Sequence, residues 1–518
     1  MGWFLSKVAR AALIVLIINL ISRILGFVRD AVIAYEFGAS GATDAYMVAY
    51  TLPYSLQAVL GMAFATVMVP VVTNYLIQDK KEEGWYLVSS VLNLTTVVLG
   101  AVTLLGMLFA PQLVRLMAPG FDGETVALTA HLSRIMFPSI IFMGLGMLIT
   151  GVLNACKKFT IPALAPAFAN IIIILTVIFF GATYRLQGLA VGTLVGFIGF
   201  MLIQLPNLRQ VGFKYSWVLE HQNPEVQKIF LAIIPMTLSI AVNQILLAVN
   251  RFFASGLMSG SITALDYANR LMNLPLGILV AAVTTAIYPA LAEGVAKKDY
   301  QGLGQTLTKG LGTVTVAILP AALGLMALKV PVVRLLFERG AFDSWATEMT
   351  ATALFYFCLG LWFVALNMVL TRVFYAFEDL KTPLFFGLLS IGINILFSLL
   401  LLPVLDHGGL ALANSLAAGI NTWLLYRALR SKIPSLDFKP VLQTTGKSLL
   451  AASIMAVVVI FLDLNWVIPV LGTLGLLLKV LFLAGLGAAL YALLVVALKV
   501  EEAQWFIQRF RSKTRRGR

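Results

Sequence analysis

Apolar residues fill this chain in long runs, with neither the alternation of a half-buried strand nor the single apolar stripe of a soluble helix. A helix needs about 20 apolar residues to cross the hydrocarbon core of a bilayer. Proline lies inside several runs, as at Pro53, Pro138 and Pro275, so kinked or tilted helices around a cavity are expected. The runs predict fourteen transmembrane helices, near residues 8–37, 44–77, 84–116, 124–154, 160–183, 187–208, 226–254, 262–293, 302–337, 344–376, 382–404, 409–428, 441–463 and 467–498.

The loops between these helices carry lysine in every second connection. Basic residues occur at Lys80, Lys157, Lys297 and Lys381, whereas the intervening loops "GASGAT", "APGFDGET", "SGLMSGS" and "LDHGG" contain none. The positive-inside rule therefore predicts that both termini lie in the cytoplasm. The opening run is too long and too charged for a cleaved signal peptide, so we expect it to remain as the first span.

Composition indicates the same class of protein. Hydrophobic residues make up 60% of the chain and charged residues 12%, against roughly 25% charged residues in soluble domains. The formal charge of +14 comes mostly from the basic loops and from the tail "RFRSKTRRGR", which we expect to be a solvated stop signal or to rest on anionic lipid. The chain is therefore predicted to be an all-α polytopic membrane protein, and its charge gives little support to nucleic-acid binding.

An internal repeat organises the chain. "KKFTIPALAPAFANIIIILTVIF" from Lys157 aligns without a gap with "EDLKTPLFFGLLSIGINILFSLL" from Glu378, an offset of 221, and Pro162 matches Pro383. We therefore expect two parallel six-helix repeats, an N-terminal lobe of residues 1–220 and a C-terminal lobe of residues 221–435. Residues 436–500 add helices 13 and 14, and residues 501–518 form the basic cytoplasmic tail. Transporters with such repeats bind cargo near the midplane, between the repeats, and work by alternating access.

Charged residues interrupt the predicted spans at a few positions. Arg23, Arg29 and Asp30 lie in the first helix and Arg270 lies in the eighth, and each charge near a bilayer centre costs on the order of 2.5–3.5 kcal/mol on insertion scales. Arg23 and Asp30 are seven residues apart, about 10 Å along a helix, which is too far for a close contact. We therefore expect the arginines to be available to a ligand, and their planar forks suit the oxygens of a diphosphate. The alternative is that each arginine pairs with an acid on a neighbouring helix and fixes packing.

Enzyme motifs are missing from the sequence. The three histidines are scattered, no HExxH motif occurs, and "TTGKS" ending at Ser448 has Val441 where a phosphate-binding loop needs glycine. His407, in a tight loop, is expected to be solvated. The two cysteines, Cys156 and Cys358, form no disulfide framework or metal motif. We therefore expect no catalytic site, no cofactor and no metal.

Three stretches are similar to those of a known family. "SRILGFVRDAVIAYEFGASGATDAYMVAYTLP", "NQILLAVNRFFASGLMSGSITALDYANRLMNLPLG" and "RVFYAFEDLKTP" resemble the signatures of the MurJ (MviN) lipid II flippases, a family of the multidrug, oligosaccharidyl-lipid and polysaccharide exporter superfamily. The resemblance implies transport of the undecaprenyl-diphosphate-linked peptidoglycan precursor from the inner to the outer leaflet of the bacterial cytoplasmic membrane. It also implies that helices 13 and 14 form a groove for the lipid tail. The substrate-binding residues implied or expected are Arg23, Arg29, Arg270, Ser22, Asp30, Asp44 and Gln57.

The chain also departs from that family. Gln57 replaces an expected cavity arginine, Met62 replaces an expected glutamate, and Asn273 replaces another. Fewer cavity charges leave other functions open: export of another polyprenyl-linked polysaccharide unit, drug antiport, or a non-transporting scaffold for cell-wall enzymes, in which the arginines would be neutralised by acids. The expected partners are the lipid-linked precursor, membrane lipids and cell-wall synthesis enzymes, with the chain itself a monomer.

Some relatives bind sodium, and residue-by-residue transfer gives the corresponding positions here. Where those relatives supply aspartates, this chain has the neutral residues Asn250 and Ser398, and cation affinity depends strongly on negatively charged oxygen ligands. We therefore expect a degenerate site whose amides cross-link helices, with transport driven by membrane potential or protons. Its residues are Asn250, Asn394, Ser398, Leu410 through its carbonyl, and Asn414.

Overall fold

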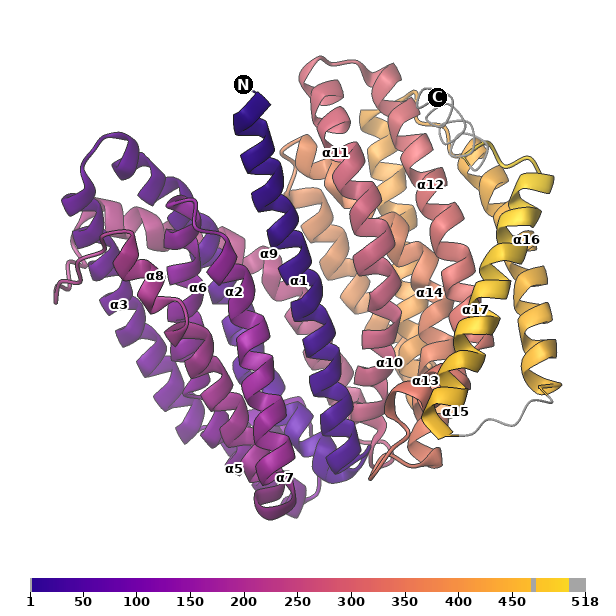
Figure 1. Ribbon diagram of the computed structural model, residues 1–518, viewed down its shortest axis with the longest axis horizontal. Coiled ribbons are helices and arrows are strands. Elements are labelled where there is room, and N and C mark those ends of the chain that lie inside the picture. Colours follow the sequence, from indigo (N-terminus) through magenta and orange to yellow (C-terminus); the bar gives the residue numbers. More distant parts are fainter. Residues whose placement is uncertain (1, 467–471, 503–518) are drawn as a thin grey trace. The chain divides into compact units, whose positions relative to one another are not determined.

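The computed structural model describes residues 2–466 and 472–502 (Figure 1), and these residues form helices joined by turns and short loops, with no strand. They divide into two compact units. Unit 1 comprises Met1–Thr263 and Arg339–Phe342, and unit 2 comprises Ala264–Glu338 and Asp343–Arg518. The short segment Arg339–Phe342 therefore belongs to unit 1, although the helices on either side of it belong to unit 2.

Unit 1 is built around α2, which packs against α5, α6 and α9, while α1 packs against α7. Its main apolar core joins α2, α3, α6 and α9 through residues such as Phe64, Trp85 and Ile229. Polar side chains cap the helix starts, since Ser40 and Asp122 accept bonds from the amides of Thr43 and Thr125. The helices are α1 (Gly2–Phe37), α2 (Gly41–Ile77), α3 (Lys81–Leu108), α4 (Ala110–Met117), α5 (Gly123–Met136), α6 (Ser139–Ala155), α7 (Thr160–Leu202), α8 (Leu205–Gln210) and α9 (Pro224–Ala254).

Unit 2 is built around α12 and α14. The helix α14 packs against α15, and α12 packs against α16, which in turn packs against α17. A core that includes Leu319, Met455 and Leu483 joins the last two helices to α12. The elements are α10 (Ser261–Pro275), whose first turn lies in unit 1, the π-helix η1 (Leu276–Val280), α11 (Ala281–Ala296), α12 (Tyr300–Ala327), α13 (Lys329–Phe337), α14 (Ser344–Ala376), α15 (Lys381–Lys432), α16 (Lys439–Leu464) and α17 (Gly472–Ala497).

The long apolar helices confirm a multi-pass membrane fold. In the described part of the chain, nine helical segments are long and apolar enough to cross a bilayer. Two of them each cover a pair of predicted spans, because α7 extends over 160–202 and α15 over 381–432. The first residues of the predicted span 467–498 and most of the predicted tail 501–518 lie outside the described residues.

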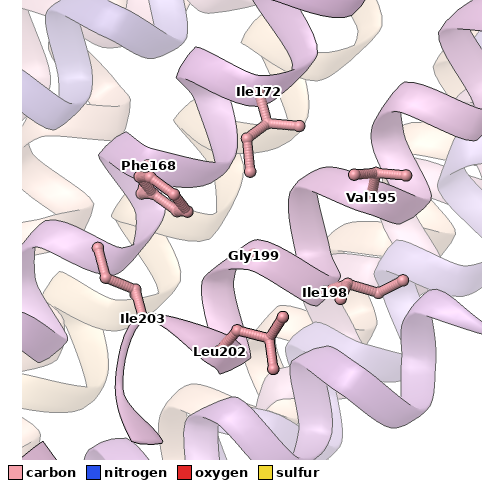
Figure 2. Close-up of a pocket in the computed structure, with 7 residues that line it drawn as sticks. All are labelled: Phe168, Ile172, Val195, Ile198, Gly199, Leu202 and Ile203. Carbon is pink, nitrogen blue, oxygen red and sulfur yellow. The ribbon is translucent and has the colours of Figure 1, made fainter. Parts of the chain in front are cut away.

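Two of these helices fold back on themselves at a single residue. The backbone of Arg185 in α7 has φ 47° and ψ −135°, and that of Asp406 in α15 has φ 47° and ψ −133°. Small residues let the arms of α7 approach closely, since a Cβ at Gly192 would lie 2.6 Å from the Thr176 side chain. An apolar pocket lies between these arms (Figure 2).

The compact units and the sequence repeat divide the chain differently. The repeat places a boundary near residue 220, whereas α9 (Pro224–Ala254) packs against α2 and belongs to unit 1. Val226, Ile229 and Ile233 of α9 are buried in the unit 1 core. Packing therefore extends unit 1 one helix beyond the N-terminal repeat, and the division at residue 220 remains a prediction about internal similarity.

Candidate functional site

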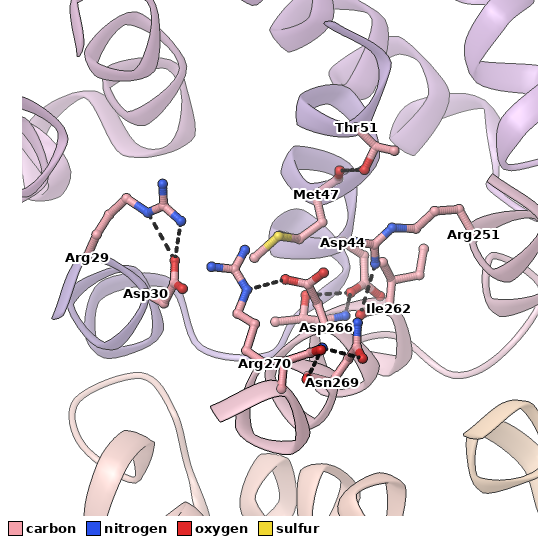
Figure 3. A network of polar contacts seen from close by, with 12 residues as sticks. Arg29, Asp30, Asp44, Met47, Thr51, Arg251, Ile262, Asp266, Asn269 and Arg270 are labelled. Carbon is pink, nitrogen blue, oxygen red and sulfur yellow. Dashed lines mark hydrogen bonds and ion pairs between the residues drawn. The ribbon is translucent and has the colours of Figure 1, made fainter. Parts of the chain in front are cut away.

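Arg29 and Asp30 form an ion pair on α1 (Figure 3). Nε and Nη2 of Arg29 donate to Oδ1 of Asp30 at 3.0 and 2.8 Å, and Nη1 donates to Oδ1 of Asn170 on α7 at 3.1 Å. Asn170 donates in turn to the backbone carbonyl of Ser22 at 3.4 Å. A guanidinium has five N–H donors, so these three bonds leave two for another acceptor.

This pairing corrects the expectation for the charges of α1. The spacing of seven residues rules out a close contact between Arg23 and Asp30, but Asp30 is adjacent to Arg29 and its carboxylate reaches that guanidinium. The Arg29 side chain is 17% exposed and that of Asp30 6%, whereas Arg23 is exposed. Arg29 is thus held in place by Asp30 and Asn170 and still has surface available to an anion.

Asp44, in the first turn of α2, is buried and binds the start of α10 (Figure 3). Its Oδ2 accepts a bond from the amide of Gly260 at 2.7 Å, and its Oδ1 accepts bonds from the amide and hydroxyl of Thr263 at 2.8 and 2.6 Å. All of these residues belong to unit 1. A carboxylate at a helix N-terminus satisfies amides that have no intrahelical partner and interacts favourably with the helix dipole. Its geometry is that of a residue that fixes a loop.

Arg251 of α9 extends this network, which sequence reasoning missed. It is buried, it donates from Nη1 to the carbonyl of Ile262 at 3.1 Å, and its charge interacts with that of Asp44. The loop also needs glycine at Gly260, where φ is +91° and a Cβ would lie 2.4 Å from the carbonyl oxygen of Ala39. Arg251 therefore serves the loop that Asp44 holds.

Arg270 on α10 pairs with an acid of its own helix. Its Nε donates to Oδ2 of Asp266, one turn earlier, at 2.8 Å, and the two side chains are 28% and 15% exposed. Asn273 donates to the carbonyl and side-chain oxygens of Asn269 at 2.8 and 3.0 Å. The π-helical turn η1 follows Pro275, and such turns are frequent at functional sites. Arg270 and Arg29 therefore each pair with an acid of their own helix, whereas the alternative expected an acid on a neighbouring helix.

The structure shows the positions of only some of the expected substrate-binding residues. Arg29, Asp30 and the carbonyl of Ser22 meet around Asn170 in unit 1, whereas Arg270 lies in unit 2. The side chain of Gln57 lies outside the described part of the structure. Unit 1 therefore holds Arg29 with Asp30 and Asn170, and unit 2 holds the pair of Arg270 and Asp266.

Four of the residues expected at a degenerate cation site lie on α15, and the fifth, Asn250, lies on α9. Asn394 and Ser398 of α15 are fully buried, and Asn394 Nδ2, Asn394 Oδ1 and Ser398 Oγ have no hydrogen-bond partner within the described residues. Asn414 donates to the carbonyl of Leu410 at 3.2 Å, which makes this a bond within one helix. Asn250 lies in unit 1 and the other four residues lie in unit 2. Unpaired buried polar groups of this kind cost about 1–3 kcal/mol each.

The described residues contain no cluster of three or more His, Cys, Asp or Glu side chains that could hold a metal ion. His407 is buried, with 8% of its surface exposed, and its Nε2 lies 3.0 Å from the carbonyl oxygen of Met349. The expectation of a solvated histidine is wrong, because the reversal of α15 at Asp406 turns this residue inward against α14.

The family model and the curated relatives that match this chain carry the same description. The family model described as lipid II flippase MurJ matches residues 33–481. The "Probable lipid II flippase MurJ" of Buchnera aphidicola subsp. Acyrthosiphon pisum is 34% identical over 430 residues, which cover 81% of this chain and 84% of the relative. The "Lipid II flippase MurJ" of Burkholderia cenocepacia is 32% identical over 434 residues, which cover 82% of this chain and 84% of the relative.

Solved structures give the same result for the fold. A structure titled "Lipid II flippase MurJ, inward closed conformation" superposes with a TM-score of 0.77 at 27% identity and covers 93% of this chain and 100% of its own. An inward-facing multidrug resistance MATE family transporter superposes with a TM-score of 0.65 at 15% identity, covering 82% of this chain and 98% of its own. The second similarity concerns the fold alone.

Proposed function

The chain belongs to the lipid II flippase MurJ family, and we propose that it moves lipid II across the bacterial inner membrane by alternating access, with the arginines of α1 and α10 binding the diphosphate of the cargo. The family assignment makes it a transporter of a lipid-linked precursor. The role of each arginine is our own inference, and it is supported by the contacts of Arg29 and Arg270.

Each of the two arginines has an acid beside it on its own helix. The guanidinium of Arg29 lies 2.8 Å from the Asp30 carboxylate, and that of Arg270 lies 2.8 Å from the Asp266 carboxylate. A diphosphate carries more negative charge than a carboxylate and accepts from a guanidinium bidentately. The cargo would therefore bind through the remaining donors of Arg29 and displace the weaker carboxylate contacts. In this proposal the cargo competes with Asp30 and Asp266 for the two arginines, whereas in a scaffold the acid pairs would be permanent.

Replacing these arginines tests the proposal. Hydrogen bonds to charged groups contribute about 1.5–3 kcal/mol each, so Arg23→Ala, Arg29→Ala or Arg270→Ala should weaken cargo binding by roughly 10- to 150-fold and abolish support of growth in cells depleted of their own flippase. Arg115→Ala, at an exposed position of α4, is the matched control and should support growth. Full complementation by the triple alanine variant would refute the role of the arginines.

The cargo itself is tested by depletion. If the chain is removed from its host, lipid II should accumulate in the inner leaflet, and identifying the accumulated intermediate distinguishes lipid II from another polyprenyl-linked unit. A drug antiporter would leave every lipid-linked intermediate unchanged and would instead lower resistance to cationic compounds. The MATE similarity, at 15% identity, concerns the fold and gives the drug alternative no support of its own.

The two-repeat organisation remains part of the proposal and is supported by paired features at one offset. Arg185 and Asp406 share the same unusual backbone angles and are 221 residues apart (406 minus 185). The amide of Gly120 donates to the Ser255 hydroxyl at 3.1 Å, and the amide of Ala341 donates to the Tyr35 carbonyl at 2.8 Å. Gly120 and Ala341 are also 221 residues apart (341 minus 120), which equals the repeat offset.

Orientation is proposed from the charges of the loops. Both termini would lie in the cytoplasm, together with Lys157 and Lys297, while the loop at Asp122 would face outward. A variant in which Cys156 and Cys358 are replaced by serine allows the test, because a single new cysteine can then be labelled with a membrane-impermeant reagent. Labelling from outside intact cells is expected at Asp122→Cys and not at Asp299→Cys, and the opposite pattern would reverse the topology.

A further inference from the structure

The two arms of α7 enclose an apolar pocket that the transport proposal does not use (Figure 2). Its volume is about 400 Å³, and its lining contains no polar side chain. Two residues of the first arm and the end of the second arm form the walls, which consist of Phe168, Ile172, Val195, Ile198, Gly199, Leu202 and Ile203. A pocket lined in this way on a transmembrane helix pair suits a hydrocarbon chain.

Gly199 leaves the space that makes the pocket. A Cβ at this position would lie 2.4 Å from Cδ1 of Ile172 and 3.2 Å from the ring of Phe168. Leu202, on the rim, is 48% exposed, so one wall remains accessible from the membrane. A larger residue at either position would fill the pocket without touching the arginine cluster of α1.

Basic side chains lie at the end of the arms where the pocket is found. Lys157 and Lys158 precede α7 and Arg209 lies in α8; all three are exposed and have no ion-pair partner within the described residues. Contacts between the arms pair Phe168 with Gly199. Lys158 precedes the start of α7 at Thr160, and Arg209 follows its end at Leu202. Phe168 is eight residues beyond Thr160, about 12 Å along the helix. Cations without an ion-pair partner in the described part of the chain therefore lie beyond the same ends of the two arms as the apolar pocket.

The second repeat has a different residue at the position of Gly199, and its equivalent end carries both acids and cations. At the offset of 221, Gly199 corresponds to Ile420, whose side chain would occupy the equivalent space, and Leu202 corresponds to Trp423. Lys158 corresponds to Asp379, which accepts from Lys432 at 2.7 Å. Burial of the Asp379 carboxyl opposes its ionisation, but the bonds from Lys432 and Thr382 hold its pKa at about 2. Arg209 corresponds to Arg430, which is also exposed. The glycine that leaves the space of the pocket thus occurs at this position in the first repeat only.

We propose that the pocket of α7 binds one acyl chain of an anionic phospholipid, with the phosphate of the headgroup against Lys157, Lys158 and Arg209. The lining supplies the apolar surface for the chain, and the three cations supply donors for the phosphate. The site is separate from the arginines assigned to the cargo and does not depend on their role.

Native mass spectrometry of the purified full-length protein tests the proposal, with phosphatidylglycerol and phosphatidylcholine of identical acyl chains as probes. Each cation near a lipid surface contributes about fivefold in affinity. We therefore expect the first phosphatidylglycerol to bind at least tenfold more tightly than phosphatidylcholine, and the variant K157Q/K158Q/R209Q to lose this preference through a decrease of about a hundredfold. The matched control K80Q/K214Q/K297Q, which removes three lysines already paired with acids, should bind both lipids as wild type does.

Filling the pocket tests the acyl-chain part. Gly199→Ile and Leu202→Trp, which copy residues of the second repeat, should each weaken binding of both lipids. Leu202→Trp starts from an exposed position, so it keeps the test valid if Gly199→Ile fails to fold, and thermal stability is measured for both. Three outcomes would overturn the proposal. They are equal affinity of the wild type for the two lipids, the same loss of affinity in the lysine control as in K157Q/K158Q/R209Q, and unchanged lipid binding in a folded pocket variant. Displacement of phosphatidylglycerol by an equimolar amount of undecaprenyl phosphate would also overturn it, since the pocket would then belong to a polyprenyl chain.

Discussion

Replacing Asp44 should release the start of α10, and the effect can be resolved amide by amide. In Asp44→Ala the amides of Gly260 and Thr263 lose acceptors at 2.7 and 2.8 Å. Bonds to a charged group contribute about 1.5–3 kcal/mol, which corresponds to roughly 10- to 150-fold faster hydrogen exchange at each amide. The measurement is hydrogen exchange by mass spectrometry on peptides that separate Gly260 from Thr263.

Asp44→Asn makes the prediction more specific. Its amide oxygen can take the place of Oδ1, which accepts both bonds from Thr263, while its NH₂ group would face the Gly260 amide, so that two donors oppose each other. Exchange should accelerate strongly at Gly260 and weakly at Thr263. Thr263→Val is the control, because it removes only the hydroxyl bond and leaves both backbone bonds intact. Wild-type exchange at Gly260 in Asp44→Ala would show that the carboxylate does not hold this loop.

Three further outcomes are expected. The pKa of Asp379 is lowered to about 2 by its bonds to Lys432 and Thr382. The bond to Lys432 therefore stabilises the protein fully above the ordinary aspartate pKa near 3.8, and this stabilisation is lost as the pH falls through 2. Thermal denaturation from pH 5 to 2 should show the loss, and the Asp379→Asn variant should lack this pH dependence. Truncation after residue 435 should leave a folded twelve-helix protein that transports poorly, as measured by circular dichroism and complementation, and loss of folding would contradict the two-repeat proposal. Transport should be equal in sodium and choline at fixed ionic strength; a sodium requirement that disappears in Asn394→Ala would contradict the absence of a tight site.

Hydropathy alone predicted a multi-pass helical membrane protein, because a bilayer imposes a run length that sequence displays directly. It did not predict where helices end. The predicted span 124–154 is divided between α5 and α6 at Pro138, and the spans on either side of Arg185 form one reversed helix. The first difference lies at Pro138, which has no amide hydrogen to donate, and the second depends on the backbone angles of Arg185. Hydropathy averages over such single residues.

The charged residues of the candidate site were visible in the sequence, but their partners were not all visible. The spacing of Asp266 and Arg270, four residues on one helix, is a readable signal for a pair. The adjacent pair Arg29 and Asp30 was not expected, because neighbouring positions on a helix usually diverge. Asp44 reaches Thr263 across 219 residues, and only the packed structure brings these two together.

The single-residue reversals of α7 and α15 also limit the insertions and deletions that this sequence can accept during evolution. A loop between two spans tolerates insertions and deletions, but a reversal made at Arg185 or Asp406 alone offers no loop in which an extra residue could be accommodated. One added residue would rotate an arm by about 100° and move Gly192 away from Thr176. The geometry of the reversal therefore fixes the number of residues in α7 and in α15. This accounts for the fact that the two repeats can still be aligned without a gap along these helices, although most of their side chains have diverged.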